Sequence, residues 1–487
     1  MDILNKVVEG MNKEQVRYFK LFLAKSHDKE DRLDVRLFDY MRKSGEKYDE
    51  KKIVQQLYSG KDKNSFYRLR NRLLRDLNKS IMIQHFDSDE SIYPLFLLAL
   101  EKFYQSKNNI KVAHFFLKKA EEHSRKTENY ELLDIIYGDF IRLSHEMSSV
   151  NPEHFIKLRS ENQLQIKYLR DIDDILAIVS HKMKLTQNFS SDVDPVLPLL
   201  QKTVKQYSLD KKLIKSPKLR FRIYHAVTQI FLQKRNYNAL EKYLLNSWKE
   251  FNQEKLFNRH NHETKLQMLV FIINTLFKNN KIKESLKFSE KLNTGMEEYQ
   301  RLHYDKYLFY YYNSLVINYS KTDRNKAIDI LNEMKSNEKI RSISFYEMFI
   351  YLNLAVCFFD KRDFHMSVRH LNRLYTLEGY SEADKSLKFK IAIAELMIRY
   401  ELKDFDVLEI KIRQVKNDFK EFILKSSNAR EILMVNIIGK LIEKESLRTE
   451  KVLLNQAKQL ILSPAKKESS DADVLNYRNW LKEKLIE

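Results

Sequence analysis

The strongest concentration of positive charge in the chain lies in residues 64–81, NSFYRLRNRLLRDLNKSI. Guanidinium and ammonium groups bind phosphates and carboxylates, so this segment has the chemistry to contact a nucleic acid or an acidic protein. On a helix with about 100° between residues, four cations share one ridge: Arg68, Arg72, Arg75 and Lys79. The sequence therefore predicts a cationic ridge as a candidate binding site.

The opposite side of the same helix is predicted to be apolar, with Phe66, Leu69, Leu73, Leu77 and Ile81. A helix that buries one stripe must expose the other, and Arg and Lys are good helix formers for the exposed side. An ordinary solvated face is therefore the competing interpretation of the ridge. A second basic run, from Lys202 to Arg222, contains a single acid, Asp210, so the ridge is not the only basic surface predicted.

Residue types that could carry out catalysis are not spaced for it. The patterns GxxxxGK[ST], GxGxxG and HExxH do not occur in the sequence. His260 and His262 would point about 200° apart on a helix, so we expect both on the surface with no metal between them. Cys357, in the apolar run LAVCFF, is predicted to be a buried, unreactive thiol. We expect no enzymatic activity, no metal and no cofactor.

The elements that must position these residues are predicted to be helices. The 487 residues include only 7 Gly and 6 Pro, where average usage would give about 34 and 24. Positive-φ turns and β-hairpins depend on Gly, so this chain is predicted to be all-α with short polar connections. Three capping residues directly precede a Pro and predict helix starts, at Asn151-Pro152, Asp194-Pro195 and Ser216-Pro217.

The overall charge and the single cysteine limit the setting in which the protein works. The formal net charge of +20 favours an acidic partner, although Lys is abundant together with Asn, Ile, Tyr and Phe, as coding by an AT-rich genome would produce. One cysteine allows no disulfide within the chain and fits a reducing compartment. The N-terminal MDILNKVVEGMNKEQ has no signal-peptide pattern, and no apolar run approaches about 18 residues. We therefore expect a cytoplasmic protein without a membrane span.

Two helices joined by a polar turn recur in five segments: 97–120, 224–247, 269–292, 311–334 and 351–374. The turn is clearest as SKNN after Gln105 and as DKRD after Phe359. A short side chain at a matching position of the second helix lets two antiparallel helices approach closely. These small residues are Ala113, Ser285, Ala327 and Ser367.

One pair resembles a degenerate tetratricopeptide repeat of bacterial type, by the spacing of Leu97, Leu100, Tyr104, Ala113 and Ala120. A similar spacing recurs from Tyr351 to Leu371. The family's Gly in the first helix and its closing Pro are absent. The resemblance implies a right-handed superhelical solenoid of antiparallel helix pairs, with a groove lined by the first helix of each pair. The implied groove positions include Lys102 and Gln105 and, as candidates for partner binding, Val270, Asn274, Phe277, Phe349, Leu352 and Phe359.

Most of these groove positions beyond residue 265 are apolar. The family's groove for acidic C-termini uses Lys, Asn and Arg at such positions, so that activity is not expected here. Apolar positions suit an amphipathic helix or an extended apolar peptide of a partner protein. They suit equally well packing within the array's own superhelix, and the residues leave both interpretations open.

Residues 1–90 lack the repeat and are predicted to form a separate helical module. A helix from Leu33, a short helix around Ile53 and the long basic helix follow one another, an order that resembles the helix-turn-helix of winged-helix regulators. IMIQHFDSDESIY, residues 81–93, is the only candidate for the strands of a wing. The predicted division is a module at 1–90, a repeat array at 91–462, and a polar loop with a capping helix at 463–487.

These patterns predict a non-enzymatic scaffold or adaptor that binds a partner protein in the groove of the repeat array. The alternative is a nucleic-acid-binding transcriptional regulator, in which helix 64–81 contacts the nucleic acid and the array senses a partner. No small-molecule substrate is indicated by the sequence.

Overall fold

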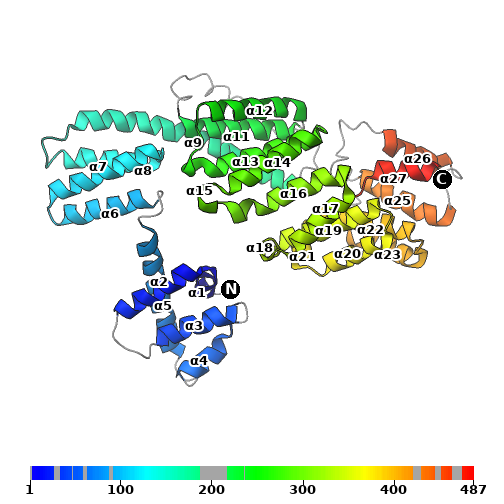
Figure 1. Cartoon of the computed structure of the whole chain (residues 1–487), viewed down its shortest axis with the longest axis horizontal. Helices are drawn as coiled ribbons and strands as arrows, with labels where there is room; N and C mark the ends of the chain where they lie inside the picture. The colour runs from blue at the N-terminus through cyan, green and yellow to red at the C-terminus, as the bar shows by residue number, and fades with distance from the viewer. Residues whose placement is uncertain are drawn as a thin grey trace. The chain divides into compact units, whose positions relative to one another are not determined.

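The computed structural model describes residues 3–26, 33–45, 48–58, 63–86, 92–186, 216–234, 236–420, 429–444, 451–462 and 474–486. Over these residues every regular element is a helix, so the predicted all-α class is confirmed. The chain divides into two compact units, Met1–Lys167 and Tyr168–Glu487, whose helices are labelled in Figure 1. The domain boundaries predicted at residues 90 and 462 stay predictions.

Unit 1 begins with five helices that share one apolar core: α1 (Ile3–Gly10), α2 (Lys13–Ser26), α3 (Leu33–Ser44), α4 (Glu50–Tyr58) and α5 (Lys63–His85). The rings of Phe19 in α2 and Phe38 in α3 meet with centroids 5.0 Å apart in this core. Arg42 of α3 donates hydrogen bonds to the carbonyls of Val8 and Glu9, at 2.8 and 2.9 Å. A cation at the carboxyl end of a helix is favourable, so this contact fastens α3 to α1.

A second core in unit 1 lies among α6 (Tyr93–Ser106), α7 (Ile110–Lys126), α8 (Tyr130–Leu143) and the first part of α9 (Pro152–Thr186). The ring of Phe140 in α8 stacks on Phe155 in α9, with centroids 4.1 Å apart. Helix α9 begins at Pro152, and the Asn151 side chain accepts a hydrogen bond from the Glu153 amide at 2.9 Å. The start predicted at Asn151-Pro152 is therefore confirmed.

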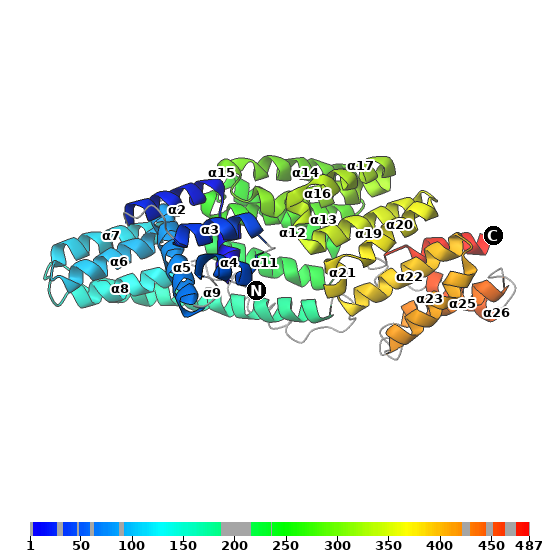
Figure 2. The ribbon, with the colours of Figure 1, turned by 90° about the horizontal axis from the view of Figure 1, so that it is seen from below.

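Unit 2 continues with helices that pack mainly on their neighbours along the chain, as Figures 1 and 2 show from two sides. After the last part of α9 its elements are α11 (Pro217–Gln233), α12 (Tyr237–Gln253), the 3₁₀ turn Arg259–Asn261, α13 (His262–Lys278), α14 (Ile282–Met296), α15 (Glu298–Arg301), α16 (Tyr304–Thr322), α17 (Arg324–Ser336), α18 (Glu338–Arg341), α19 (Ser344–Asp360), α20 (Phe364–Tyr375), α21 (Glu378–Glu382), α22 (Lys385–Glu401), α23 (Phe405–Asp418), α25 (Ala429–Lys444), α26 (Lys451–Leu462) and α27 (Tyr477–Ile486).

All five predicted helix pairs are present, as α6–α7, α11–α12, α13–α14, α16–α17 and α19–α20. The four small residues predicted at the helix contacts are fully buried. Two of them also join the helices of their pair by hydrogen bonds. Ser285 Oγ donates to the carbonyl of Ile273 at 3.0 Å, and Ser367 Oγ donates to the carbonyl of Ala355 at 2.7 Å.

The turns between consecutive helices use positive φ without glycine. Asn108, Glu128, Asn280, Arg362 and Lys403 have φ between 50° and 65°, and each lies two residues after the end of a helix. The next amide bonds back to a carbonyl five residues earlier, for example Asp363 to Phe358 at 3.0 Å. This is the helix-ending motif that usually carries glycine. These turns therefore do not need glycine, because the bonds to the last carbonyls compensate for the left-handed residue.

Several other predictions concern the ends of elements. The start at Ser216-Pro217 is confirmed, since α11 begins at Pro217 and Ser216 Oγ accepts from the Leu219 amide at 3.3 Å. Residues 81–85 extend α5 and form no wing strand. The predicted start at Asp194-Pro195 and the loop at 463–473 lie outside the described residues. The right-handed superhelix and the helix-turn-helix resemblance stay predictions.

Candidate functional site

Helix α5 places the predicted cationic ridge as the sequence indicates. Phe66, Leu69, Leu73 and Leu77 are buried in the core of α1–α5, while Ile81 is half-buried. The four predicted cations of the ridge are all exposed: Arg68, Arg72, Arg75 and Lys79. The amphipathic helix is thus confirmed, and its use as a binding site stays a prediction.

Ion pairs within unit 1 reduce the charge that α5 can offer to a partner. Asp34 of α3 is only 1% exposed, and its Oδ2 lies 3.7 Å from the Arg72 guanidinium. Glu50 of α4 accepts a hydrogen bond from Arg70 at 2.7 Å and another from the Tyr67 hydroxyl at 3.1 Å. These contacts hold α3 and α4 against α5. Arg72 is therefore partly neutralised, whereas Arg75 and Lys79 lie further along the helix.

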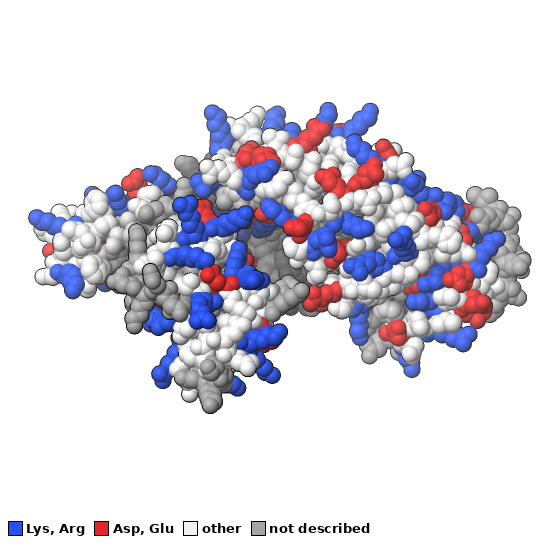
Figure 3. Space-filling view, turned by 60° about the horizontal axis from the view of Figure 1, so that its bottom comes forward, with Lys and Arg blue, Asp and Glu red and all other residues white. Residues whose placement is uncertain are grey.

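The remaining basic residues do not gather into one surface on the face drawn in Figure 3. Lys and Arg side chains are distributed over this face, with Asp and Glu between them. In the second basic run, Lys202 to Lys215 lie outside the described residues. Arg220 pairs with Glu250 and Glu254, each at 2.5 Å, and Arg222 pairs with Asp173 at 3.1 Å. Arg220 and Arg222 are thus both paired with acids of unit 2.

The six predicted groove residues lie on two first helices of unit 2, and all are half-buried: Val270, Asn274 and Phe277 on α13, and Phe349, Leu352 and Phe359 on α19. Lys321 of α16 places its ammonium 4.2 Å from the centre of the Phe277 ring. Phe349 packs edge-on against Phe309 of α16, with centroids 5.1 Å apart. Phe277 and Phe349 are therefore each partly covered by a neighbouring helix of the same unit.

A more exposed apolar group lies on the second turn of α16 and at the start of α19. It consists of Tyr310, Ile343, Phe345 and Tyr346, which we call the aromatic surface. Tyr310, Ile343 and Phe345 are 38%, 46% and 53% exposed. Tyr346 stacks on the buried Phe309 with centroids 3.8 Å apart. Burial, together with the neighbouring Tyr310 and a hydrogen bond to it, raises the pKa of Tyr346 to about 12, so the Tyr346 phenol stays neutral near pH 7.

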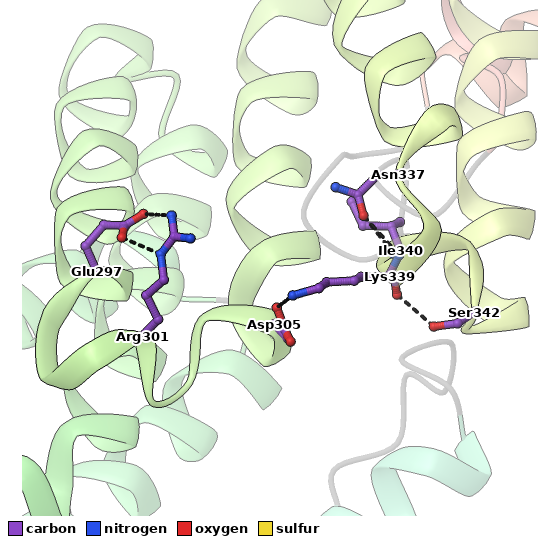
Figure 4. A network of polar contacts seen from close by, with 7 residues as sticks. All are labelled: Glu297, Arg301, Asp305, Asn337, Lys339, Ile340 and Ser342. Carbon is purple, nitrogen blue, oxygen red and sulfur yellow. Dashed lines mark hydrogen bonds and ion pairs between the residues drawn. The ribbon is translucent and has the colours of Figure 1, made fainter. Parts of the chain in front are cut away.

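Ion pairs of α15, α16 and α18 are satisfied within unit 2, as Figure 4 shows. Lys339 of α18 bonds to Asp305 of α16 at 2.5 Å, and Arg301 forms two bonds to Glu297 at 2.5 and 2.6 Å. Asn337 caps α18 by accepting from the amides of Lys339 and Ile340, at 3.0 and 3.3 Å. The Ser342 hydroxyl donates to the Lys339 carbonyl at 2.9 Å. These contacts fix α18 next to α16 and leave the local charges paired.

Sequence reasoning missed the aromatic surface, although a signal for part of it was available. Phe345 lies four residues before Phe349 and seven before Leu352, so it belongs to the same helical stripe as two predicted groove residues. Extending that stripe by one turn would have found it. Tyr310 had no such signal. It lies in a segment dense in aromatics, YLFYYY at 307–312, where helical periodicity does not distinguish the buried rings from the exposed ones.

The structure buries two of the three residues considered for metal binding or catalysis, His262 and Cys357, and exposes the third, His260. His260 is exposed, but His262 is fully buried against Tyr299 and His303, so the surface position predicted for His262 was wrong. Burial lowers its pKa. Cys357 is buried as predicted, and burial raises its pKa to about 11. Among the described residues no cluster of three or more His, Cys, Asp or Glu could hold a metal ion.

Two further findings bear on the kind of protein this is. Within the described part of the chain, no helix has the length and apolar character needed to cross a bilayer. Comparison of the chain with protein-family models, curated proteins and solved structures finds no match. The tetratricopeptide-like resemblance therefore stays a prediction, supported by the all-helical fold and the paired helices.

Proposed function

We propose that the chain is a non-enzymatic interaction scaffold whose unit 2 binds an apolar segment of a partner protein on the aromatic surface. The observation that carries this proposal is the exposure of Tyr310 in α16 and of Ile343 and Phe345 at the start of α19, where Tyr346, next to Phe345, is hydrogen-bonded to Tyr310. Contiguous exposed apolar side chains are unfavourable in water and commonly mark interaction surfaces. Aromatic anchors also contribute large contact areas at low cost in side-chain entropy.

The partner segment is expected to be apolar and uncharged where it touches this surface. Asp305, Glu297, Lys339 and Arg301 are already paired within unit 2. Charges that are paired with each other exert little net attraction on a charged partner. The Tyr310 and Tyr346 hydroxyls are the polar groups available to orient the segment. Aliphatic side chains packing on the rings would therefore supply most of the binding free energy.

The bound segment would extend along α19, toward the predicted groove. Phe349 and Leu352 follow Phe345 on the same stripe, one and two turns further along the helix. Both are half-buried, so each presents part of its surface beside the exposed ring. This continuity supports a short amphipathic helix or an extended peptide as the ligand.

Affinity purification of the full chain from its native cells, with nuclease treatment, tests the proposal. Phe345→Asp should lose a protein that the wild type retains, while Ile410→Asp should keep it. Ile410 on α23 is also 53% exposed, so it is a matched control for an added charge in unit 2. The purified partner should then bind Phe345→Asp at least about tenfold more weakly by calorimetry.

Two outcomes would contradict the scaffold proposal. Equal retention of the partner by wild type and Phe345→Asp would show that the aromatic surface is not the binding site. Loss of all retained material after nuclease treatment would favour the alternative, a nucleic-acid-binding protein.

A further inference from the structure

A second surface, on unit 1, lies along the carboxyl-terminal half of α5. An open hollow of about 520 Å³ is lined there by residues that recur every three or four positions, so they share one side of the helix. They are Asn71, Leu74, Arg75, Asn78, Lys79, Met82, Ile83 and Phe86. This stripe differs from the one that packs in the core of α1–α5, because Leu69, Leu73 and Leu77 are absent from it.

The part of the hollow nearest the end of α5 is apolar and exposed. Met82 and Ile83, in the last turn of α5, are 42% and 50% exposed although both side chains are apolar. Phe86, directly after the helix, stacks on Phe96 of α6 with centroids 4.7 Å apart. Its ring is therefore held in place at the end of the hollow. Leu74 contacts the core of α1–α5 and contributes the apolar residue at the other end.

The amino-terminal half of the hollow carries the positive charge. Arg75 and Lys79 are exposed and lie one turn apart beside Leu74 and Met82. Within the described residues neither has an acidic partner at ion-pair distance, in contrast to Arg70 and Arg72. Arg68 continues the same row of cations toward the start of the helix. The hollow thus combines an apolar floor with cations that no described acid of unit 1 neutralises.

We infer that this hollow binds an acidic amphipathic helix of a partner protein. From Asn71 to Phe86 the lining spans about 22 Å along α5, which equals about four helical turns of a ligand. Aliphatic residues of such a helix would pack on Leu74, Met82 and Ile83. Its acidic residues would face Arg75 and Lys79, where the carboxylates gain charge-assisted hydrogen bonds. This surface and its ligand are independent of the aromatic surface on unit 2.

The composition of the hollow favours an acidic helix over a nucleic acid. Binding to a phosphate backbone depends on many simultaneous contacts with cations. One cation of the ridge, Arg72, is already paired with Asp34. Exposed Met82 and Ile83 have no role in contacting phosphates, whereas an amphipathic helix buries both. A ligand complementary to this surface must therefore carry both acidic and apolar side chains, as an acidic amphipathic helix does.

Fluorescence anisotropy with the full chain tests this inference. The probe is a labelled synthetic helix of about 18 residues, with leucines at positions i, i+3, i+4 and i+7 and glutamates beside them. Two control peptides share its length: one has the same composition in scrambled order, and the other has lysines in place of glutamates. Only the first peptide should bind, and its affinity should fall as salt is raised from about 50 to 500 mM.

Variants in the hollow separate the two contributions. Met82→Asp and Ile83→Asp should each weaken binding of the probe about tenfold or more, and Arg75→Glu with Lys79→Glu should do the same at low salt only. Ile135→Asp and Lys118→Glu place the same charges at exposed positions on α8 and α7 and should leave the affinity unchanged. Circular dichroism melts of all variants confirm that the helices of unit 1 are retained.

Four results would overturn the inference. They are equal binding of the scrambled peptide, no binding of the acidic helix, and tighter binding of a duplex DNA that Met82→Asp does not affect. The fourth is concentration-dependent dimerisation that Met82→Asp abolishes, measured by sedimentation, which would assign the hollow to a second copy of this chain.

Discussion

Replacing Gly379 by alanine should destabilise unit 2, because α21 passes extremely close to the start of α19. A Cβ atom at Gly379 would lie 2.4 Å from the carbonyl oxygen of Ser344 and 2.7 Å from its carbonyl carbon. Real Cβ atoms essentially never come within 3.0 Å of another heavy atom. Both atoms belong to the main chain, so no side-chain rotation relieves the contact. One of the two helices must move by at least about 0.6 Å in a close-packed interior.

Overpacking of this kind typically costs about 1–3 kcal/mol. Alanine is a better helix former than glycine by about 0.5–1 kcal/mol, and α21 is a helix of only 5 residues, which limits that gain. The net loss expected for Gly379→Ala is therefore about 2 kcal/mol. Phe345 follows Ser344 directly, so the same shift should also weaken binding of the partner at the aromatic surface.

Urea unfolding followed by tryptophan fluorescence measures this loss in unit 2 alone. The chain has 2 Trp residues, and both Trp248 and Trp480 lie in unit 2. With a denaturant dependence of about 2 kcal/mol per molar urea, the midpoint should fall by about 1 M.

Gly439→Ala is the matched control, because a Cβ atom at Gly439 would meet nothing closer than Ile412 Cδ1, at 3.9 Å. In the middle of α25 this change should stabilise unit 2 by about 0.5–1 kcal/mol. If both alanines raise the midpoint, the close approach of α21 to α19 is wrong.

Three further predictions use the same unfolding measurement. Lys403→Gly should raise the midpoint, because φ of Lys403 is 57° and glycine relieves about 1 kcal/mol of left-handed strain; a lower midpoint would refute the turn geometry. Ser367→Ala should lower the free energy of unfolding by about 1 kcal/mol, because it removes the buried hydrogen bond to Ala355. Ser367→Leu should lower it by about 3 kcal/mol by overpacking. Similar losses for both variants would show that α19 and α20 are not in close contact. Burial, with Lys335 and Arg369 nearby, lowers the pKa of His370 to about 4. The unfolded chain takes up a proton that the folded chain excludes, so stability should fall by about 2–3 kcal/mol from pH 6.5 to 4; His370→Gln should remove that part of the pH dependence, and an unchanged profile would contradict it.

Local signals in the sequence predicted the helices and their ends with considerable accuracy. The turn SKNN correctly separates α6, which ends at Ser106, from α7, which begins at Ile110. The turn DKRD does the same for α19 and α20, which end at Asp360 and begin at Phe364. These boundaries depend on residues within a few positions, and such short-range preferences can be read directly from the chain.

Predictions about single side chains were less successful where distant helices decide the outcome. His262 was expected at the surface because its ring would point away from His260 on a helix, but Tyr299 and His303 cover it from further along the chain. Non-glycine residues occupy the left-handed turns because the helix-ending hydrogen bonds stabilise a conformation that residue preference alone disfavours.

The amino-acid sequence by itself determined that this protein is all-α, that its helices form pairs, and that α5 is apolar on one side and basic on the other. These properties follow from periodicity and turn residues, which act over short distances. The tertiary structure alone decided that Phe345 is exposed while Phe349, on the same stripe, is partly covered by Phe309 of α16. Exposure depends on which side chains other helices bring close, and for that reason the surfaces available to a partner emerge only when the helices have packed.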